Sequence, residues 1–394
     1  MQGRRVVVTG TGVVSPVGLG ARAFWAALLG PADVGKTREI QDWDPSPWFD
    51  GPKDARRADR FTQLAAGAAG LALDQSGDPG GDPDRIGVLI GTGIGGLHTL
   101  EEQVEVNRVR GPQRVSPFMI PMLMPNAAAA RVSMRYGFRC PCAPTVTACA
   151  AWTHSIGNAA RLIFTGRCDA VVTGGTESSI TTTGVAGFEN MTALSTSGVS
   201  RPFDKDRDGF VMAEGAGVLV LEELEHARAR GAVPLAEVLG SASTADAHHI
   251  TAPSPGGSGA VTCMELALAD AGINPEDVVQ VNAHGTSTPL NDAAEAEAIV
   301  KVFGTKGPAV TSIKGVTGHS LGAAGALEAA AVVLSMQHGH IPPTANHVAA
   351  EDDLAPIDVV TGEGRDWTPG PTLSNSFGFG GHNGCVVFGP APEA

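Results

Sequence analysis

Apolar positions along this chain alternate between short continuous runs and longer stretches with helical spacing. Residues 86–90 (IGVLI) and 170–173 (AVVT) are nearly uninterrupted apolar runs, which are typical of strands buried on both faces. Further strands are expected at 4–9, 218–221, 278–282, 309–313 and 385–388, and helices at 21–29, 150–164, 222–230, 295–303 and 321–336. This alternation predicts an α/β fold with packed layers.

The domain organisation predicted from this rhythm is two intimately packed halves rather than two free domains. We expect the halves to be residues 1–240 and 241–394. The Pro- and Gly-rich segment 252–259 (APSPGGSG) is a candidate loop between them, and the sequence contains neither a clean linker nor a sharp internal repeat.

Composition favours a large globular core and excludes a nucleic-acid binder. Hydrophobic residues make up 43% of the 394 residues and charged residues 17%, while the net charge is −14. A nucleic-acid-binding protein would need a concentrated basic stripe, and none is present. The densest basic cluster is Arg56, Arg57 and Arg60. It is either a solvated helix face or a docking spot for an acidic partner.

The sequence also predicts a cytoplasmic protein without a membrane span, disulfides or a bound metal. No hydrophobic leader precedes the first strand, and the longest apolar run, 321–336, is short and rich in Ala and Gly, which suits a buried helix. Six cysteines in a chain of this length do not make a disulfide framework. Cys140 and Cys142 lack a second ligand pair, so zinc is not expected.

The first candidate for chemistry is Cys149, within TVTACAAWTHSIG (145–157). β-Branched residues precede the cysteine and a helical pattern follows it, so Cys149 is expected at a helix N-terminus. The helix dipole and free N–H groups there stabilise a thiolate. The alternative is an inert buried cysteine.

Two further segments contain candidate histidines, and a third could supply backbone donors. His284 ends a buried strand in VNAHGTST (281–288), and Lys314 and His319 share the Gly-rich stretch SIKGVTGHSLG (312–322). Each could equally be a turn with a satisfied side chain. The stretch NSFGFGGHN (375–383) could bring backbone N–H groups to a ligand, as an oxyanion hole requires, or be only a tight turn.

Two other motifs match known signatures without the expected context. Residues 91–96 (GTGIGG) fit the dinucleotide-binding GxGxxG, but the following segment lacks the strand and acidic residue of that fold. Residues 318–322 (GHSLG) fit the GxSxG elbow of serine hydrolases, but four residues separate this motif from the preceding strand.

Taken together, these motifs resemble the β-ketoacyl-acyl-carrier-protein synthases, and most closely the type II elongating enzymes. The resemblance runs from VVVTGTGVVSPVG (6–18) through SPFMIPMLMPNAAA (116–129), TACAA (147–151), the segment 201–232, NAHGTSTPLND (282–292) and KGVTGHSLGAAGALE (314–328) to NSFGFGGHN (375–383). It implies a thiolase-like fold, with two similar halves in a five-layer αβαβα sandwich, and a homodimer.

The resemblance also implies roles for individual residues. Cys149 would accept the acyl chain, and His284 and His319 would stabilise the enolate formed when a malonyl thioester loses CO₂. Lys314 would tune the site, with Glu328 as its supporting carboxylate. The N–H groups of Cys149 and Phe379 would form an oxyanion hole, and Phe379 would also act as a gate. Thr286 and Thr288 would contact the pantetheine arm, and the substrate channel would be lined by Thr251, Phe188, Met124 and Phe377.

The implied reaction is a decarboxylating condensation between an acyl-enzyme and malonyl-acyl-carrier protein. It yields β-ketoacyl-acyl-carrier protein and CO₂, in fatty-acid elongation or a specialised pathway, and needs no cofactor. The carrier protein would dock at Arg56, Arg57 and Arg60. Some family members hold a monovalent cation, which here would lie at Asn282, Ala283, Glu328, Ser374 and Asn375.

The chain departs from the family pattern at three positions. Trp152 stands where glycine is common, three residues after Cys149, and should face the nucleophile on the same side of the helix. We expect it to contact substrate and to narrow the acyl or malonyl pocket, or else to be tucked into the core. Thr192 replaces an arginine that meets the carrier protein, and Gly315 replaces a serine with little expected effect.

Two alternative functions remain. The same fold could serve as a malonyl decarboxylase or as the partner subunit of a polyketide-type synthase, although such partners usually lack the cysteine that is present here as Cys149. A serine hydrolase acting through Ser320 is the alternative from another class.

Overall fold

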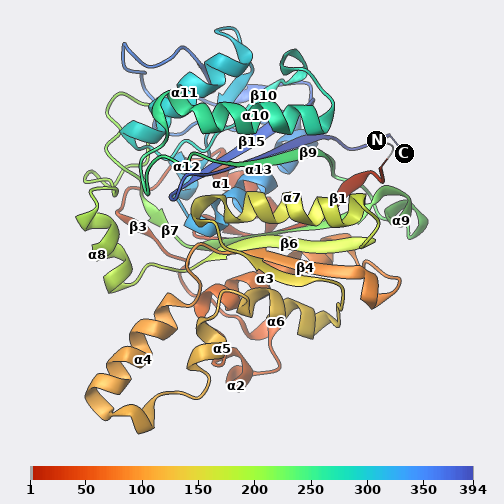
Figure 1. The fold of residues 1–394 in the computed structure, drawn as a ribbon, viewed down its shortest axis with the longest axis vertical. Coiled ribbons are helices and arrows are strands. Elements are labelled where there is room, and N and C mark those ends of the chain that lie inside the picture. Colours follow the sequence, from red (N-terminus) through yellow and green to blue (C-terminus); the bar gives the residue numbers. More distant parts are fainter. Residues whose placement is uncertain (1–2, 394) are drawn as a thin grey trace.

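The computed structural model describes residues 3–393, and it contains two β-sheets interleaved with three layers of helices. Figure 1 shows these layers stacked from one face of the molecule to the other in the order helix, sheet, helix, sheet, helix. The predicted α/β class and the five-layer thiolase-like sandwich are both confirmed.

The first sheet comes from the N-terminal part of the chain. Its strand order is β5 (Cys142–Thr145), β4 (Ile86–Gly91), β6 (Ala170–Glu177), β8 (Gly215–Glu223) and β1 (Val6–Ser15), with the short β2 (Gly18–Leu19) folded back on β1. β4 pairs in parallel with β5 and β6, whereas β8 is antiparallel to β6 and β1. Every residue of β1, β4, β6 and β8 is buried, as continuous apolar runs predict.

The second sheet has a similar mixed order. It comprises β13 (Asp358–Val359), β11 (Ala309–Thr311), β10 (Gln280–Asn282), β15 (Thr372–Gly378), β16 (His382–Pro390) and β9 (Ala236–Ala245). β9 also pairs with Val6–Val8 of β1, so the two sheets join at one corner. The expected boundary between halves at residue 240 falls within β9 and stays a prediction.

Helices cover both outer faces and fill the space between the sheets. α3 (Arg60–Ser76) and α6 (Ala127–Tyr136) cover the first sheet, and α10 (Ser258–Ala271) and α11 (Pro289–Phe303) cover the second (Figure 1). The middle layer contains α7 (Ala151–Phe164) and α13 (Ala324–His338), which both contact strands of both sheets. This position explains the small apolar residues of α13, since residues 324–336 are all buried.

The remaining helices flank these layers, except that α1 (Gly20–Leu28) packs on α13 and α12 (Lys314–Thr317) is fully buried. The flanking helices are α2 (Pro52–Ala55), α4 (Leu97–Arg110), α5 (Met119–Leu123), α8 (Thr182–Asn190) and α9 (Leu224–Ala229). The short strands β3 (Thr37–Arg38) and β7 (Met212–Ala213) pair in parallel, and β12 (His340–Ile341) pairs with β14 (Arg365–Asp366). Within residues 3–393, no helix is both long and apolar enough to cross a membrane.

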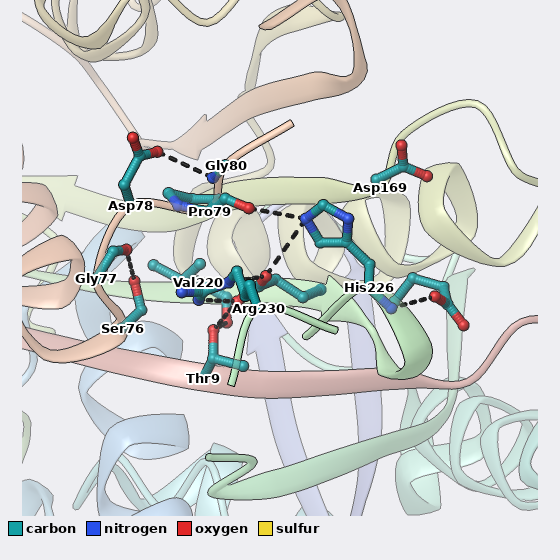
Figure 2. Close-up of polar contacts among 12 residues, drawn as sticks. Thr9, Ser76, Gly77, Asp78, Pro79, Gly80, Asp169, Val220, His226 and Arg230 are labelled. Atoms are coloured by element: carbon teal, nitrogen blue, oxygen red, sulfur yellow. Dashed lines mark hydrogen bonds and ion pairs between the residues drawn. The ribbon is translucent and has the colours of Figure 1, made fainter. Parts of the chain in front are cut away.

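A buried polar network ties together the end of the first sheet at which β6 begins (Figure 2). Glu222 of β8 is fully buried and accepts hydrogen bonds from Thr9 of β1 and from the guanidinium of Arg230. His226 of α9 lies above this pair and contacts the carbonyl oxygen of Pro79 at 2.8 Å. A buried carboxylate with this many donors keeps its charge compensated, so the network fixes α9 against the sheet.

Candidate active site

Cys149 lies in a single 3₁₀ turn (Ala148–Ala150) directly before α7. The turn follows β5, and Ala148 has a φ of 49°, a left-handed conformation that alanine seldom adopts. The cysteine side chain is only 6% exposed. The structure thus has Cys149 at the start of a helix, where the sequence pattern put it, and in a strained strand-to-helix connection.

The thiol of Cys149 is neutral in this structure, which differs from the expected thiolate. Burial raises its pKa to about 12. The charge of Lys314 and the backbone N–H groups of Phe379 and Cys149 act in the opposite direction but do not offset burial. Exclusion of water destabilises the thiolate by more than the helix N-terminus stabilises it. A base must therefore take the proton during catalysis.

His319 is the base within reach of this thiol. Its Nε2 lies 3.1 Å from Sγ of Cys149. Burial and the nearby charge of Lys314 hold the pKa of His319 well below its usual value, so the ring is neutral and can accept a proton. The ring stands edge-on to Phe210 and to His284, with centroid distances of 5.2 and 5.3 Å.

Lys314 and Glu328 form a buried ion pair behind His284. The ammonium contacts Glu328 and the carbonyl oxygen of His284, and lies 3.4 Å from Nδ1 of His284. A cation cannot accept a hydrogen bond, so Lys314 donates to Nδ1 and the ring proton of His284 resides on Nε2. Burial, together with Lys314, holds the pKa of His284 well below its usual value.

Glu295 of α11 is a site carboxylate that sequence reasoning missed. It is 1% exposed and accepts the backbone N–H groups of His284 and Gly285 at 2.8 and 2.7 Å. Burial raises the pKa of Glu295 to about 7, although these two donors act in the opposite direction. A glutamate on the apolar face of a helix was a weak signal for this contact, because charged residues are almost never buried unless they have partners.

The turn between β15 and β16 brings Phe379 to the nucleophile. The N–H of Phe379 donates toward the Cys149 sulfur. A Cβ on Gly378 would lie 3.1 Å from the backbone nitrogens of Cys149 and Ala150, so a side chain here would displace the two backbones by a few tenths of an ångström, and glycine suits this close approach. The two N–H groups expected to form an oxyanion hole, those of Cys149 and Phe379, are therefore brought together.

A cavity of about 350 Å³ opens onto Cys149. Its walls include most of the predicted substrate-contacting residues as well as the site itself, namely Cys149, His284, His319, Thr251, Thr286, Thr288, Phe377 and Phe379. The hydroxyl groups of Thr286 and Thr288 lie 2.9 Å apart on one wall. Thr192 also lines the cavity, with a φ of 57°.

Three predicted substrate contacts lie elsewhere. Trp152 is fully buried among apolar residues of the middle layer, near Gly175 of β6 and Gly325 of α13, and does not line this cavity. The expectation that its indole narrows the pocket is therefore wrong for this cavity. Phe188 packs edge-on against Phe210 behind the cysteine, and Met124 is 41% exposed at the end of α5.

The side chains expected around a monovalent cation fit such an ion in part. Asn282 and Ser374 are paired on β10 and β15, and Oε2 of Glu328 is buried without a hydrogen-bond partner among the described residues. The NH2 groups of Asn282 and Asn375 donate to Ser374 and toward Glu295, and Oδ1 of Asn375 accepts from the Cys385 thiol at 3.2 Å. Oδ1 of Asn282, the carboxylate of Glu328, the hydroxyl of Ser374 and the backbone of Ala283 are the oxygen donors that remain for a cation.

The donor atoms of Cys149, His284 and His319 lie within 4.8 Å of one another, a spacing that also suits a soft divalent metal. Lys314 opposes such an ion. It fixes the proton of His284 on Nε2, the nitrogen that a metal in the cavity would need, and it adds a positive charge behind the ring. The site is therefore better suited to anions than to metal cations.

The two motifs that match the dinucleotide-binding and serine-hydrolase signatures, residues 91–96 and 318–322, have structural roles here. The N–H groups of Gly93 and Gly322 both donate to the buried carboxylate of Glu177, at 2.7 and 3.2 Å, so the 91–96 loop is occupied by an internal anion. Ser320 is buried and follows the short helix α12 rather than a strand. It therefore lacks the strand-to-helix elbow of a serine hydrolase.

The predicted docking cluster is only partly available at the surface. Arg60 is paired with the buried Glu214 at 2.6 Å and also donates to the carbonyl oxygen of Ile40, so its guanidinium is engaged within the fold while its side chain is 30% exposed. Its assignment to a docking surface stays a prediction. Arg56 and Arg57 are exposed, as is Lys53 in α2, which the sequence analysis did not include. These three cations define the α2 basic patch.

The fold and the site define a thiolase-like α/β protein with a buried Cys–His–His constellation at the base of a cavity. The profiles of the β-ketoacyl synthase N-terminal and C-terminal domains match residues 30–227 and 235–348. The chain is also 45% identical to 3-oxoacyl-[acyl-carrier-protein] synthase 2 of Staphylococcus aureus, over 98% of both chains. It therefore belongs to the β-ketoacyl synthase family.

Solved structures agree with this assignment. The ishigamide ketosynthase/chain length factor has a TM-score of 0.92 and 34% identity, covering 99% of this chain and 100% of that one. A type II polyketide ketosynthase solved with its acyl-carrier protein and a bound hexaketide has a TM-score of 0.89 and 31% identity at the same coverage.

Proposed function

We propose that this protein is a type II β-ketoacyl-acyl-carrier-protein synthase that condenses an acyl group on Cys149 with malonyl-acyl-carrier protein. The observation that carries the proposal is the contact between Cys149 and His319, with His284 alongside at the base of one cavity. The named relative is a synthase of this kind, and its similarity extends over nearly the whole chain.

The first half-reaction is transfer of an acyl group to the enzyme. As Sγ of Cys149 attacks the thioester carbonyl, its proton moves to Nε2 of His319, 3.1 Å away. The N–H groups of Cys149 and Phe379 stabilise the resulting oxyanion. The carrier thiolate leaves and takes the proton from His319, which returns the ring to its neutral form.

The second half-reaction is decarboxylation of the malonyl group. Loss of CO₂ places negative charge on the thioester oxygen, which neutral imidazole N–H groups can stabilise. Lys314 keeps the proton of His284 on Nε2, which faces the cavity, and the low pKa of each ring keeps both histidines neutral. His319 takes part in this step as the tautomer with its proton on Nε2, whereas the tautomer with a bare Nε2 accepts the Cys149 proton in the first half-reaction. The carbanion then attacks the acyl thioester, and collapse of the oxyanion releases the Cys149 thiolate, which takes up one proton from solvent to restore the neutral thiol.

The cavity walls suit a pantetheine arm that carries these groups from solvent. Thr286 and Thr288 present hydroxyl groups, and Met191, Leu290 and Thr251 lie along the same cavity. Met191 and Leu290 are 45% and 67% exposed, so the cavity mouth is partly apolar. We propose that the α2 basic patch attracts the acidic carrier protein. The hexaketide-bound ketosynthase complex, whose partner is a carrier protein, supports this partner.

We further propose that the protein is a homodimer that pairs along β5. This strand lies at the edge of the first sheet, with β4 as its one described neighbour and residues 142–144 exposed. Val146 and Met134 nearby are 48% and 72% exposed. An open, exposed edge strand is a ready site for pairing with a second chain. The ketosynthase/chain length factor relative makes a heterodimer the competing assembly.

The two halves of the chain would contribute different residues to the active site. We propose that residues 1–240 supply the nucleophile and residues 241–394 supply both histidines. We also propose that the enzyme works in the cytoplasm, which the six free cysteines support. A monovalent cation near Glu328 and Ser374 would steady the strands next to the site.

The decisive experiment is incubation with an acyl-carrier thioester and malonyl-carrier protein, followed by mass spectrometry. We expect the acyl group on Cys149 and a β-ketoacyl product. Release of CO₂ without a condensation product would instead indicate a decarboxylase or a partner subunit. An acyl group on Ser320 with free acid as the only product would indicate a hydrolase.

Sedimentation of the isolated protein and of its Val146→Lys variant tests the dimer. We expect the wild type to sediment as a dimer and the variant to dissociate.

A further inference from the structure

Arg38 is a buried cation without an anionic partner. Arg38 is only 6% exposed. Among the described residues, no carboxylate lies within ion-pair distance of its guanidinium. Burial lowers the pKa of Arg38, although arginine remains protonated at neutral pH. Charged side chains are costly to bury, so a buried arginine needs strong compensating contacts.

Those contacts are backbone carbonyls, and two of the three belong to α12. The guanidinium donates to the carbonyl oxygens of Val316 and Gly315, the latter at 3.2 Å, and to that of Asp33 at 2.9 Å. The final carbonyls of a helix lack partners within the helix and carry partial negative charge. Arg38 therefore neutralises the C-terminal end of α12 (Lys314–Thr317).

This short helix joins two residues of the active site. Lys314 is its first residue, and His319 follows it after Gly318, which has a φ of 71°. The Arg38 side chain packs against this turn, since its Cδ lies 3.4 Å from where a Cβ on Gly318 would be. Arg38 thus contacts the segment that sets the spacing between the two catalytic side chains.

The backbone of Arg38 is tied to the same segment by a second route. β3 pairs with β7, with Arg38 opposite Ala213. On its other side β7 holds His319, whose N–H donates to Val211 at 2.8 Å and whose carbonyl accepts from Ala213 at 3.0 Å. Backbone and side chain of Arg38 therefore fix His319 from two directions.

A further contact of α12 is the close approach of Gly315 to Ala345. A Cβ on Gly315 would lie 2.6 Å from the carbonyl oxygen of Ala345, so the serine usual at this position would not fit here. This close approach differs from the small effect expected for Gly315. It leaves α12 in contact with both Ala345 and the Arg38 guanidinium.

We propose that Arg38 is a positioning residue that holds Lys314 and His319 in place through α12. The inference rests on the condensing activity proposed above. Arg38 touches neither the cavity nor the nucleophile, so it acts through the carbonyls of Gly315 and Val316. Loss of its hydrogen bonds shifts the two side chains relative to His284 and Cys149. Acylation depends on His319 alone, whereas decarboxylation depends on His319 and also on His284, which Lys314 contacts, so CO₂ release is affected through two residues and should fall more than acylation.

The test compares Arg38→Met with Arg38→Lys in the full-length protein. For Arg38→Met we expect kcat to fall by ~10- to 100-fold with KM for malonyl-carrier protein within about threefold, because small misplacements of catalytic groups cost about this much. Acylation of Cys149 should fall less than CO₂ release. Arg38→Lys keeps a cation near the same carbonyls and should recover most of the lost rate.

The control is Arg230→Met, which removes a partly buried arginine that is paired with Glu222 in the network of Figure 2, away from α12. It should lower the melting temperature while kcat per folded molecule stays unchanged. The proposal is overturned if Arg38→Met keeps the wild-type kcat, or if both half-reactions fall together and Arg38→Lys restores neither.

If Arg38→Met does not fold, Arg38→Gln decides the question, because it removes the charge and most of the donors while keeping a polar side chain. A lower kcat at unchanged KM in Arg38→Gln then supports the positioning role, and a wild-type kcat overturns it. A wild-type protein that forms no β-ketoacyl product would refute the proposed function itself, so the two failures are distinguishable.

Discussion

Nε2 of His319 lies 3.1 Å from Sγ of Cys149, although the two residues are 170 positions apart in the chain. Each of them is at most 6% exposed. The pair is thus a neutral thiol beside a neutral imidazole, and the proton moves to His319 only as the sulfur attacks a substrate carbonyl, which leaves the imidazolium paired with the oxyanion that forms. This relationship makes the reactivity of Cys149 depend on pH.

Alkylation of free Cys149 should accelerate steadily as the pH rises. Since burial raises the pKa of the thiol to about 12, the thiolate fraction grows across the whole accessible range. We expect the iodoacetamide rate to increase about tenfold per pH unit between pH 6.5 and 9, because the thiolate is the reactive form. Peptide mass spectrometry separates Cys149 from the exposed Cys142. A plateau below pH 8 would contradict this prediction.

Replacing Gly378 with alanine should impair the oxyanion hole. The new Cβ would lie 3.1 Å from the nitrogens of Cys149 and Ala150, which forces the two backbones apart. The expected loss in the acylation rate is ~10²- to 10³-fold, as for removal of one oxyanion donor. Single-turnover acylation measures it. Gly187→Ala in α8 is the control, because nothing lies within 4 Å of its added Cβ, and it should acylate normally.

The turnover rate should rise with pH through a group that titrates near 7. Ionised Glu295 accepts the N–H groups of both His284 and Gly285, and burial raises its pKa to about 7. Protonation replaces an acceptor with a donor and loosens His284. We therefore expect kcat to increase between pH 6 and 8, and this step to disappear in Glu295→Gln. Persistence of the same step in the variant would assign it to another group.

Glu295 should also affect stability with a defined sign. Its pKa in the folded protein is raised above the ordinary glutamate value of 4.5, so its protonated form is favoured by folding. The corresponding stability is fully present below pH 4.5 and is lost as the pH rises through about 7. Urea unfolding at pH 5 and pH 8 should show a larger decrease for the wild type than for Glu295→Gln.

Truncating Trp152 should destabilise the protein without widening substrate choice. Its indole is fully buried in the middle layer, so Trp152→Ala leaves a core cavity that costs about 3–5 kcal/mol. Chemical unfolding measures this loss, while acyl chain-length preference should stay unchanged. Leu290→Ala, at the exposed cavity wall, is the contrasting variant and should alter KM but not stability. New long-chain activity in Trp152→Ala would restore the pocket-narrowing hypothesis.

Charge reversal in the α2 basic patch should weaken use of carrier-linked substrates. Arg56 and Arg57 are exposed, and their replacement by glutamate removes attraction for an acidic carrier protein. We expect KM for malonyl-carrier protein to rise about tenfold at low salt and the difference to shrink at high salt, because salt screens surface charges. Short malonyl-pantetheine substrates should react as before. Lys306→Glu, at an exposed turn before β11, is the control and should leave KM for malonyl-carrier protein unchanged.

The sequence determined the layered α/β architecture and the chemical types at the site. Continuous apolar runs predicted the buried strands β4 and β6. Local motifs also marked Cys149, His284, His319 and Phe379 as candidates for the site, and all four line the same cavity. This was possible because strand burial, glycine turns and nucleophile chemistry depend on neighbouring residues in the chain. The order of these segments along the chain was sufficient to identify the family.

Tertiary structure alone decided what depends on burial and on distant partners. A residue three positions after Cys149 could face either the cavity or the core, and packing against Gly175 and Gly325 put Trp152 in the core. Likewise, Arg60 pairs with Glu214 across the fold rather than with solvent. The pKa of Cys149 is set by how much water is excluded around it, and the role of Arg38 by a helix far along the chain. Such long-range contacts and the desolvation they cause are absent from local sequence patterns.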